Sequence, residues 1–447
     1  MRIGLPTLRT LKSRIRGRLR QRAELRLIES SDVGIIDRHL NGLPNLVTEV
    51  APAEVQLQET RPELRGREVR NIRMTKRVPK VSLIGPWNYA SGLGMASRGY
   101  ISALWQSGLQ VNLHPIYRPF HIHGRSALTI DVCDFDGPAD VCIIHLNPDA
   151  WPGLLEDRHY RQIMGAKKRV GLWVWEMERI PKQWSTAFRE VDAVWAPSNY
   201  CRAAFELASA APVRVLPHVV MAPAPNLRPS QMREKLGLPS NRQLILYNFD
   251  GASYLIRKNP FALVRAFGAS GLHRQGWSLV LKTKNLMDRP DEGRELVSLI
   301  EGFREVYLIN QNLSQYENFA LMESCSVYAS PHSAEGFGLT VAEAMALGKI
   351  VVATDYSGTR DFLDSTCGFP VKWRKQQLDR SHGHYFRGGV WAEIDEVDLA
   401  RALNDAARAA ADPDQVIGHA AAARIRTQLS PISIGACIRE LIQDLVQ

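Results

Sequence analysis

Two glutamates, Glu335 and Glu343, stand on either side of a glycine turn in the stretch SAEGFGLTVAEAMALGK. A short apolar run typical of a β-strand precedes the turn, and residues 339–347, which have a helical pattern, follow it up to Gly348. Glycines at a helix N-terminus let the backbone approach a ligand closely and aim N–H groups at it, which favours phosphate. We therefore expect a diphosphate to bind at the three residues of the turn, Gly336, Phe337 and Gly338.

The two glutamates can then be given separate tasks. Glu343 would stand about 7 Å further along the helix axis, where a carboxylate can accept both hydroxyls of a ribose attached to the diphosphate. Glu335 would lie on the other side of the phosphates, beside a transferred group. The alternative is structural: Thr340 and Glu343 fit a capping box, and Glu335 would only complement the helix dipole. The spacing by itself favours neither interpretation.

Composition places the chain among globular, non-membrane proteins. Its 447 residues suit two domains of about 200 residues each. Apolar residues make up 45% and charged residues 23%, and no run of 18 apolar residues could span a bilayer. The six cysteines are scattered without a CxxC pair, which indicates reduced thiols in a cytosol and argues against structural zinc. The basic N-terminus lacks the apolar segment of a secretory signal.

The net charge of +10 is concentrated in the first 26 residues, where arginines alternate with leucines at roughly helical spacing. This arm could bind an anionic membrane surface or remain a solvated tail, and the sequence leaves both open. Nucleic acid is a weaker alternative, because no aromatic or zinc-finger pattern accompanies the arginines.

From residue 80 onward, β-branched runs alternate with helical segments in two series separated by a proline-rich break. Such alternation predicts parallel sheets covered by helices on both faces, and two series predict two Rossmann-like α/β domains facing a central cleft. We expect a basic N-terminal extension, a first domain, a linker, a second domain, and C-terminal helices that pack back toward the first domain. Their ranges are 1–79, 80–220, 221–238, 239–405 and 406–447.

With its strand, its glycine turn and the downstream Ser357-Gly358 loop, the pair of glutamates resembles the E-x7-E signature of retaining GT-B glycosyltransferases of family 4. The resemblance covers about residues 80–440. It implies a GT-B fold, a nucleotide-sugar donor held mainly by the second domain, an acceptor held by the first, and neither metal nor cofactor. It also implies that Glu335 faces the donor sugar and that Glu343 binds ribose.

The stretch FDGASYLIRKNP resembles the phosphate-binding strand-loop-helix of that family and supplies Arg257 and Lys258. The family usually carries an arginine five residues before this lysine, and here that residue is Ser253. Arg257, Lys282 or Lys284 could replace the missing phosphate contact. We expect only one of the last two to reach the cleft, and we assign that role to Lys282.

The first series supplies further candidates. Gly92 and Gly94 lie in a glycine-bearing loop that resembles the family loop bordering the donor phosphates, and its spacing does not match a dinucleotide-binding GxGxxG. His145 ends an apolar strand, as a family histidine does, and we expect it to act with Glu335 in orienting the donor sugar. Asn147 and Glu176, the latter in the aromatic stretch WVWE, are the acceptor-side candidates, because sugars stack on aromatic rings.

These residues predict a cytosolic, metal-independent retaining glycosyltransferase that moves a sugar from a UDP-, GDP- or ADP-linked donor to a glycan or lipid-linked acceptor in cell-surface polysaccharide assembly. Retention would follow from front-face attack, since no carboxylate for a covalent intermediate can be identified from the sequence. The alternatives are a catalytically weak scaffold subunit, suggested by Ser253, and another GT-B enzyme such as an epimerase or a phosphorylase. A pyridoxal phosphate phosphorylase is disfavoured, because no segment matches its lysine site.

Overall fold

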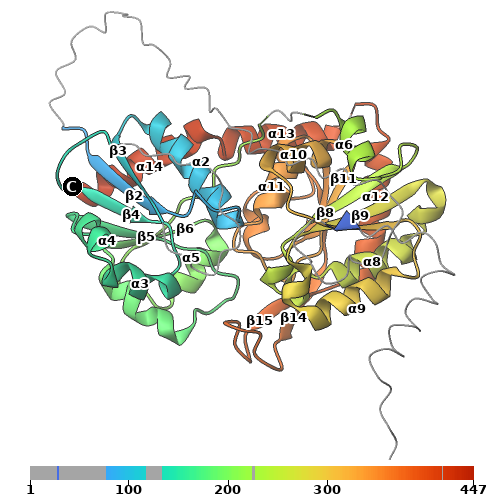
Figure 1. Ribbon diagram of the computed structural model, residues 1–447, viewed down its shortest axis with the longest axis horizontal. Coiled ribbons are helices and arrows are strands. Elements are labelled where there is room, and N and C mark those ends of the chain that lie inside the picture. Colours follow the sequence, from blue (N-terminus) through green and yellow to red (C-terminus); the bar gives the residue numbers. More distant parts are fainter. Residues whose placement is uncertain (1–27, 30–76, 117–132, 224–226, 415) are drawn as a thin grey trace, which may run out of the picture.

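The computed structural model describes residues 28–29, 77–116, 133–223, 227–414 and 416–447. The predicted basic arm, the first 26 residues, therefore lies outside the described residues, and of residues 27–76 only a two-residue strand, β1 (Ile28–Glu29), is described. Two parallel sheets with flanking helices lie side by side, each in its own domain (Figure 1). No helix in the described ranges is long and apolar enough to cross a membrane.

The first domain is built on a six-stranded sheet in the order β3-β2-β4-β5-β6-β7, in which every pairing is parallel. Its central strands are continuous apolar runs buried on both faces, as helices on both sides of a sheet require. The strands are β2 (Lys80–Gly85), β3 (Gln110–Pro115), β4 (Val141–Ile144), β5 (Lys168–Leu172), β6 (Ala193–Ala196) and β7 (Val213–Val215). The helices are α2 (Gly92–Ser107), α3 (Trp151–Glu156), α4 (Arg158–Ile163) and α5 (Asn199–Glu206).

The second sheet has the order β1-β10-β9-β8-β11-β12-β13, and its pairings are also parallel. Its further strands are β8 (Gln243–Asn248), β9 (Trp277–Thr283), β10 (Val306–Asn310), β11 (Val327–Ser330), β12 (Ile350–Thr354) and β13 (Phe369–Val371). The helices are α6 (Pro229–Lys235), α7 (Leu255–Lys258), α8 (Pro260–Ser270), α9 (Pro290–Ile300), α10 (Gln315–Glu323), α11 (Leu339–Ala346) and α12 (Glu396–Ala410).

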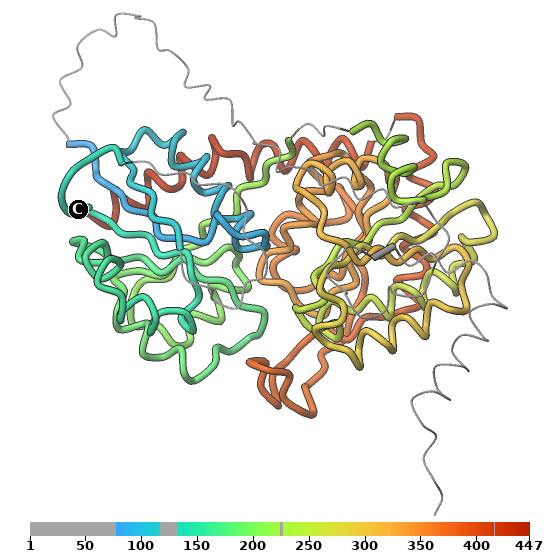
Figure 2. The backbone as a smooth tube through the Cα atoms, viewed as in Figure 1, coloured from blue at the N-terminus to red at the C-terminus, as the bar shows by residue number. Residues whose placement is uncertain are grey.

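Two elements that follow the second sheet cross toward the first domain. The antiparallel hairpin of β14 (Trp373–Gln377) and β15 (Val390–Ile394) projects at the lower edge of Figure 1. The last helices, α13 (Val416–Gln428) and α14 (Pro431–Val446), run along the upper edge, and the tube in Figure 2 ends beside the first domain. There α14 packs against α2.

The strand orders locate the positions where ligands bind in open parallel sheets. In the second sheet the order reverses between β8 and β11, and in the first it reverses between β2 and β4. A crevice opens outside the carboxyl ends of the strands at such a switch point, because the flanking helices turn to opposite faces there. The segments that follow these four strands carry Lys258 at the end of α7, Glu335, Gly92 at the start of α2, and His145.

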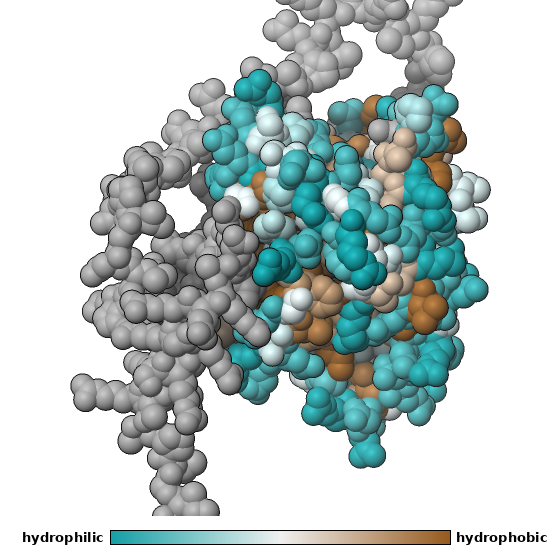
Figure 3. All heavy atoms as spheres, turned by 90° about the vertical axis from the view of Figure 1, so that its right-hand side faces the viewer, coloured by the Kyte–Doolittle hydropathy of each residue, from teal (hydrophilic) through white to brown (hydrophobic). Residues whose placement is uncertain are grey.

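Strands are present in both of the predicted series, and the structure adds elements that the sequence did not indicate. β3 (QVNLHP) carries polar residues, and β14 (WRKQQ) is mostly exposed and charged, so neither has the apolar pattern of a buried strand. The expected linker contains α6, which begins with Pro229, a residue that suits the first turn of a helix. Hydrophilic side chains predominate on the face in Figure 3, and apolar ones are scattered over it.

The contact between α14 and α2 depends on Gly435. A Cβ at this position would meet the Ala103 carbonyl oxygen at 2.5 Å, so the two helix backbones could not keep their present spacing. We expect Gly435→Ala to destabilise the fold by about 1–3 kcal/mol. Differential scanning fluorimetry would show this as a lowered Tm. The control is Gly302→Ala, because a Cβ there meets nothing within 4 Å and should leave the Tm unchanged or slightly raised.

Candidate functional site

An ion pair joins the two switch-point loops of the second domain. Lys258 ends α7, shortly after β8, and its Nζ lies 2.5 Å from Oε1 of Glu335 in the loop between β11 and α11. The backbone N–H of Glu335 donates to Ser357 Oγ at 2.8 Å, which fixes the loop from the next strand. Burial by itself would raise the pKa of Glu335, but Lys258 and Arg257 outweigh it and lower that pKa to about 2. Glu335 is therefore a carboxylate at neutral pH.

Arg257 connects this pair to the first domain. Its side chain is 4% exposed, and its Nη1 donates to the Ala334 carbonyl oxygen at 2.8 Å and lies 3.4 Å from Glu335 Oε2. Its Nη2 lies 3.8 Å from Oε1 of Glu176, which follows β5 in the first domain. Arg257 was a candidate for the missing phosphate contact, yet in the structure its guanidinium is committed to a carbonyl and two carboxylates of the protein.

Glu176 is held by the hairpin of the second domain. The hydroxyl of Tyr385, in the loop between β14 and β15, donates to Glu176 Oε2 at 3.2 Å. Trp391 Nε1 on β15 donates to the Glu176 carbonyl oxygen at 3.1 Å. Trp175, beside it, is buried and packs 5.5 Å from the Tyr385 ring, measured between centroids. The acceptor-side candidate thus lies at the domain interface with its carboxylate already partnered.

The glycine turn is a contact point of the two domains. Ser198 Oγ, at the start of α5, donates to the Gly336 carbonyl oxygen at 2.6 Å, and a Cβ on Gly336 would lie 2.3 Å from a methyl carbon of Val174. The Phe337 ring packs 4.9 Å from the ring of His218. Gly338 has a φ of +94°, which a side chain would strain, so all three residues of the turn are constrained by their surroundings.

Glu343 does not form a capping box. The N-cap of α11 is Gly338, no side chain caps this helix, and Thr340 already lies in its first turn. The capping-box alternative is therefore wrong, because the helix begins earlier than that motif requires. Glu343 is 7% exposed, and burial raises its pKa to about 8, opposed by the charge of Arg98 on α2. Its role toward ribose stays a prediction.

His145 lies at the corresponding position of the first domain. It follows β4, is fully buried, and its Nδ1 lies 2.7 Å from Ser97 Oγ on α2. Burial, with His218 nearby, lowers the pKa of His145 well below its usual value, so the ring is neutral. Its Nε2 is buried without a hydrogen-bond partner in the part of the chain that the structure describes. A ligand hydroxyl would satisfy this atom.

The other first-domain candidates have structural contacts. Gly94 lets the first turn of α2 pass close to the preceding loop, since a Cβ there would meet the Tyr89 carbonyl oxygen at 2.2 Å. A Cβ on Gly92 would meet nothing within 4 Å, so the N-terminus of α2 is open. Asn147 Oδ1 accepts a hydrogen bond from the Val174 N–H at 2.9 Å and thereby supports the loop that carries Glu176.

Lys282, on β9, and Lys284, just beyond the end of that strand, lie close to each other in the second domain. Lys284 Nζ donates to the Ala90 carbonyl oxygen of the first domain at 2.5 Å and lies 3.4 Å from Asp250. Lys282 is buried next to both groups, and burial, followed by Lys284, lowers its pKa to about 8. Lys284 lies just beyond the end of β9, so strand alternation does not govern its direction, and the assignment of Lys282 as the lysine that reaches the cleft stays a prediction.

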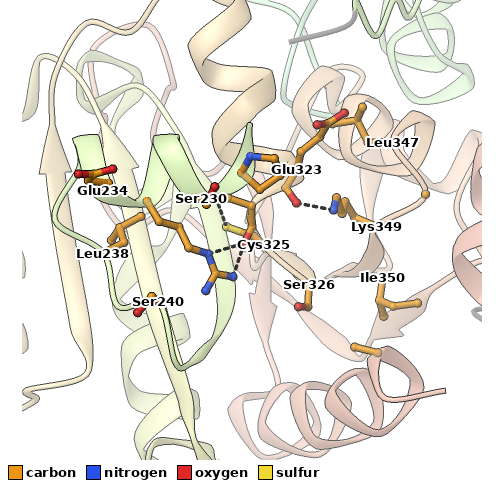
Figure 4. A pocket seen from close by; sticks show the side chains of 15 residues that line it. Ser230, Glu234, Leu238, Ser240, Glu323, Cys325, Ser326, Leu347, Lys349 and Ile350 are labelled. Carbon is orange, nitrogen blue, oxygen red and sulfur yellow. Dashed lines mark hydrogen bonds between the residues drawn. The ribbon is translucent and has the colours of Figure 1, made fainter. Parts of the chain in front are cut away.

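A cavity of about 780 Å³ lies elsewhere in the second domain, beside the amino ends of β11 and β12 (Figure 4). Its two cations are occupied: Arg233 donates to the Ser324 carbonyl oxygen, and Lys349 donates to that of Glu323. No predicted residue lines it, and parallel sheets bind ligands at their carboxyl ends, so we place the site at the switch points instead. Among the described residues, no group of three His, Cys, Asp or Glu side chains could hold a metal ion.

Sequence reasoning missed three residues that the structure brings to this region, namely Arg98, Tyr385 and Trp391. Arg98 lies on α2 four residues after Gly94, outside the glycine motif that begins this helix. The two aromatic residues belong to a hairpin whose first strand is polar and exposed. No local signal indicated that this hairpin folds against the first domain.

The comparisons with known proteins concern mainly the second domain. Residues 231–375 match the family of glycosyl transferases group 1. This segment contains Lys258, Glu335 and Glu343. A D-inositol 3-phosphate glycosyltransferase of Xylanimonas cellulosilytica is 34% identical over 131 residues, which are 29% of this chain and 30% of that protein. The match thus spans less than a third of the length of this curated relative.

Solved structures resemble the whole two-domain arrangement. A glycosyltransferase from Rickettsia africae has a TM-score of 0.61 at 16% identity over 83% of this chain and 100% of its own. HepE of Anabaena, solved with UDP and glucose, has a TM-score of 0.55 at 16% identity over 82% of this chain and 100% of its own. Sucrose-phosphate synthase of Thermosynechococcus elongatus has 0.56 at 19% identity over 83% and 99%. The predicted α/β, two-domain GT-B fold is confirmed.

The buried Glu343 carboxyl gives a test of the site that requires no substrate. Between about pH 4.5, its ordinary pKa, and pH 8, its carboxyl holds a proton in the folded state and has released it in the unfolded state. The contribution of Glu343 to the free energy of unfolding must therefore fall as pH rises through this window, by up to about 1.4 kcal/mol per pH unit.

Glu343→Gln removes this titration. We expect the Tm of the variant to exceed that of the wild type by more at pH 8 than at pH 5, measured by differential scanning calorimetry. Equal differences at both pH values would show that Glu343 is ionised in the folded protein.

Proposed function

We propose that this protein is a retaining glycosyltransferase of the family 4 type, which moves a sugar from a nucleotide-sugar donor to a glycan or lipid-linked saccharide. The observation that carries the proposal is the ion pair of Lys258 and Glu335 at the switch point of a sheet that matches glycosyl transferases group 1. That position joins a cation, a carboxylate and the N-terminus of α11 beyond the carboxyl ends of β8 and β11.

The chemistry follows from the charges that develop. Cleavage of the bond between the anomeric carbon and the diphosphate leaves positive charge on the sugar and negative charge on the phosphate. Lys258, the N-terminus of α11 and the pair Lys282 and Lys284 would stabilise the leaving diphosphate, without a metal ion or cofactor. Glu335 is ionised and would face the sugar, while the free Nε2 of His145 would bind one of its hydroxyls.

Retention would follow from front-face attack, in which the departing phosphate oxygen takes the proton of the acceptor hydroxyl. The nucleotide would be UDP, GDP or ADP; HepE of Anabaena, a relative in fold alone, was solved with UDP and UDP-glucose. We place the acceptor against the first domain, near Glu176 and Asn147. Cell-surface polysaccharide assembly on the cytosolic side of a membrane would suit a basic arm attracted to anionic lipid.

One observation favours a second candidate, a glycosyltransferase-like scaffold subunit with weak catalysis. Ser253 stands where the resemblance leads us to expect an arginine, and Arg257 is engaged by Glu176 and Glu335. Donor phosphates would then depend on lysines alone. A thermal-shift panel of UDP, GDP, ADP and their sugars separates the candidates at the binding step, because a bound donor raises the Tm by mass action.

Substitution of the ion pair tests the proposed function. We expect Lys258→Ala and Glu335→Ala each to lower kcat for donor hydrolysis or sugar transfer by about 100-fold or more, since each removes a charge at the reacting centre. Released nucleoside diphosphate is measured with the donor chosen from the thermal-shift panel. The matched control is Lys167→Ala, an exposed lysine paired with Asp140 near the amino end of β5, which should retain full activity. Full activity of Lys258→Ala would exclude the assigned role.

A further inference from the structure

The hairpin β14–β15 of the second domain contacts one short segment of the first domain, residues 175–178, through hydrogen bonds and an ion pair. Tyr385 and Trp391 bond to the carboxylate and carbonyl of Glu176, and Lys375 Nζ lies 3.2 Å from Glu178 Oε1. In Figure 1 the hairpin descends from the second domain on the side of the first. These contacts tie the loop after β5 to an element more than 190 residues later in the chain.

Arg257, Lys258, Glu335 and Glu176 form a buried cluster of charges, and the contact with Tyr385 positions the carboxylate of Glu176 in it. Arg257 is nearly inaccessible, and it balances Glu335 of its own domain and Glu176 of the other. Its distance to Glu176, 3.8 Å, is longer than a hydrogen bond, whereas the Tyr385 hydroxyl is 3.2 Å from the second carboxylate oxygen. The hydroxyl therefore orients this carboxylate, and the Tyr385 ring, 5.8 Å from the guanidinium carbon, covers Arg257.

A bound diphosphate would change the demands on this cluster. Lys258 and Arg257 now share Glu335, so two cations and two carboxylates balance each other. An added diphosphate would attract the ammonium of Lys258, because a lysine carries a compact charge on a flexible stem. Arg257 would then be the cation that holds Glu335 in place, and its own position depends on Glu176.

We propose that Tyr385 is a positioning residue of the transfer reaction: its hydroxyl fixes Glu176, and Glu176 through Arg257 sets the orientation of Glu335 toward the donor sugar. The inference rests on the proposed function. The side chain of Tyr385 contacts Glu176, Arg257 and neighbouring aromatic rings, so we assign it an effect on the chemical step through these neighbours. Within the hairpin, this role belongs to the hydroxyl of Tyr385, and a Tyr385→Phe substitution removes that hydroxyl while keeping the aromatic ring.

The test compares two tyrosine hydroxyls. Tyr385→Phe removes the bond to Glu176. Tyr356→Phe is the matched control, because Tyr356 is equally buried and its hydroxyl contacts Glu178, 3.5 Å away, two residues along the same segment. Transfer or hydrolysis of the donor is measured at steady state, and both variants are also scanned for Tm.

We expect Tyr385→Phe to lower kcat by about 10-fold or more while KM for the donor stays within about two-fold, because an interaction made at the transition state is lost and binding of the diphosphate is retained. Tyr356→Phe should stay within about two-fold of wild type in both constants. The effects of Tyr385→Phe and Glu176→Gln should be less than additive, since both act on one chain of contacts.

The outcomes separate the two claims. Equal losses of kcat in Tyr385→Phe and Tyr356→Phe, or a change confined to KM or Tm, would overturn the positioning role while the wild-type activity upheld the proposed function. A wild-type protein that binds and turns over no nucleotide-sugar would overturn both.

Discussion

A buried cation between carboxylates of two domains constrains much of this molecule. A guanidinium removed from water must be surrounded by acceptors and opposite charge, or its desolvation would oppose folding. Both terminal nitrogens of Arg257 lie near such groups, namely Ala334, Glu335 and, from the first domain, Glu176, whereas its buried Nε has no hydrogen-bond partner among the described residues. The loop after β5, the glycine turn and the hairpin must therefore lie where they do for the cation to be neutralised.

The same constraint relates the fold to the chemistry. Lys258, Glu335, His145 and Gly92 are far apart in the sequence, yet each follows a strand at the switch point of its sheet. Because parallel strands bring their carboxyl ends to one edge, loops from distant segments converge there without any local signal between them. The ion pair of Arg257 with Glu176 and the hydrogen bond of Ser198 with Gly336 then join the two edges.

The commitment of Arg257 to the protein alters the expected donor site. As the sequence presents it, this arginine is one of several cations free to replace the arginine absent at Ser253. In the folded chain Arg257 contacts Glu335 and Glu176. The cations that we assign to phosphate are therefore Lys258, Lys282 and Lys284. Arg257 thus supports the position of the Glu335 carboxylate instead of contacting phosphate.

The sequence by itself determined the two parallel sheets. Strands covered by helices on both faces are continuous apolar runs, and such runs can be read from the order of the residues. It also determined the turn at Gly336 to Gly338 and the helix that follows, since glycine is the residue that adopts a φ of +94° without strain. Only the tertiary structure decided that Glu343 is no helix cap, that Lys282 is buried beside Lys284 and Asp250, and that an exposed hairpin reaches Glu176. These are properties of pairs of segments whose side chains meet through packing, and such contacts leave no periodic pattern in the chain.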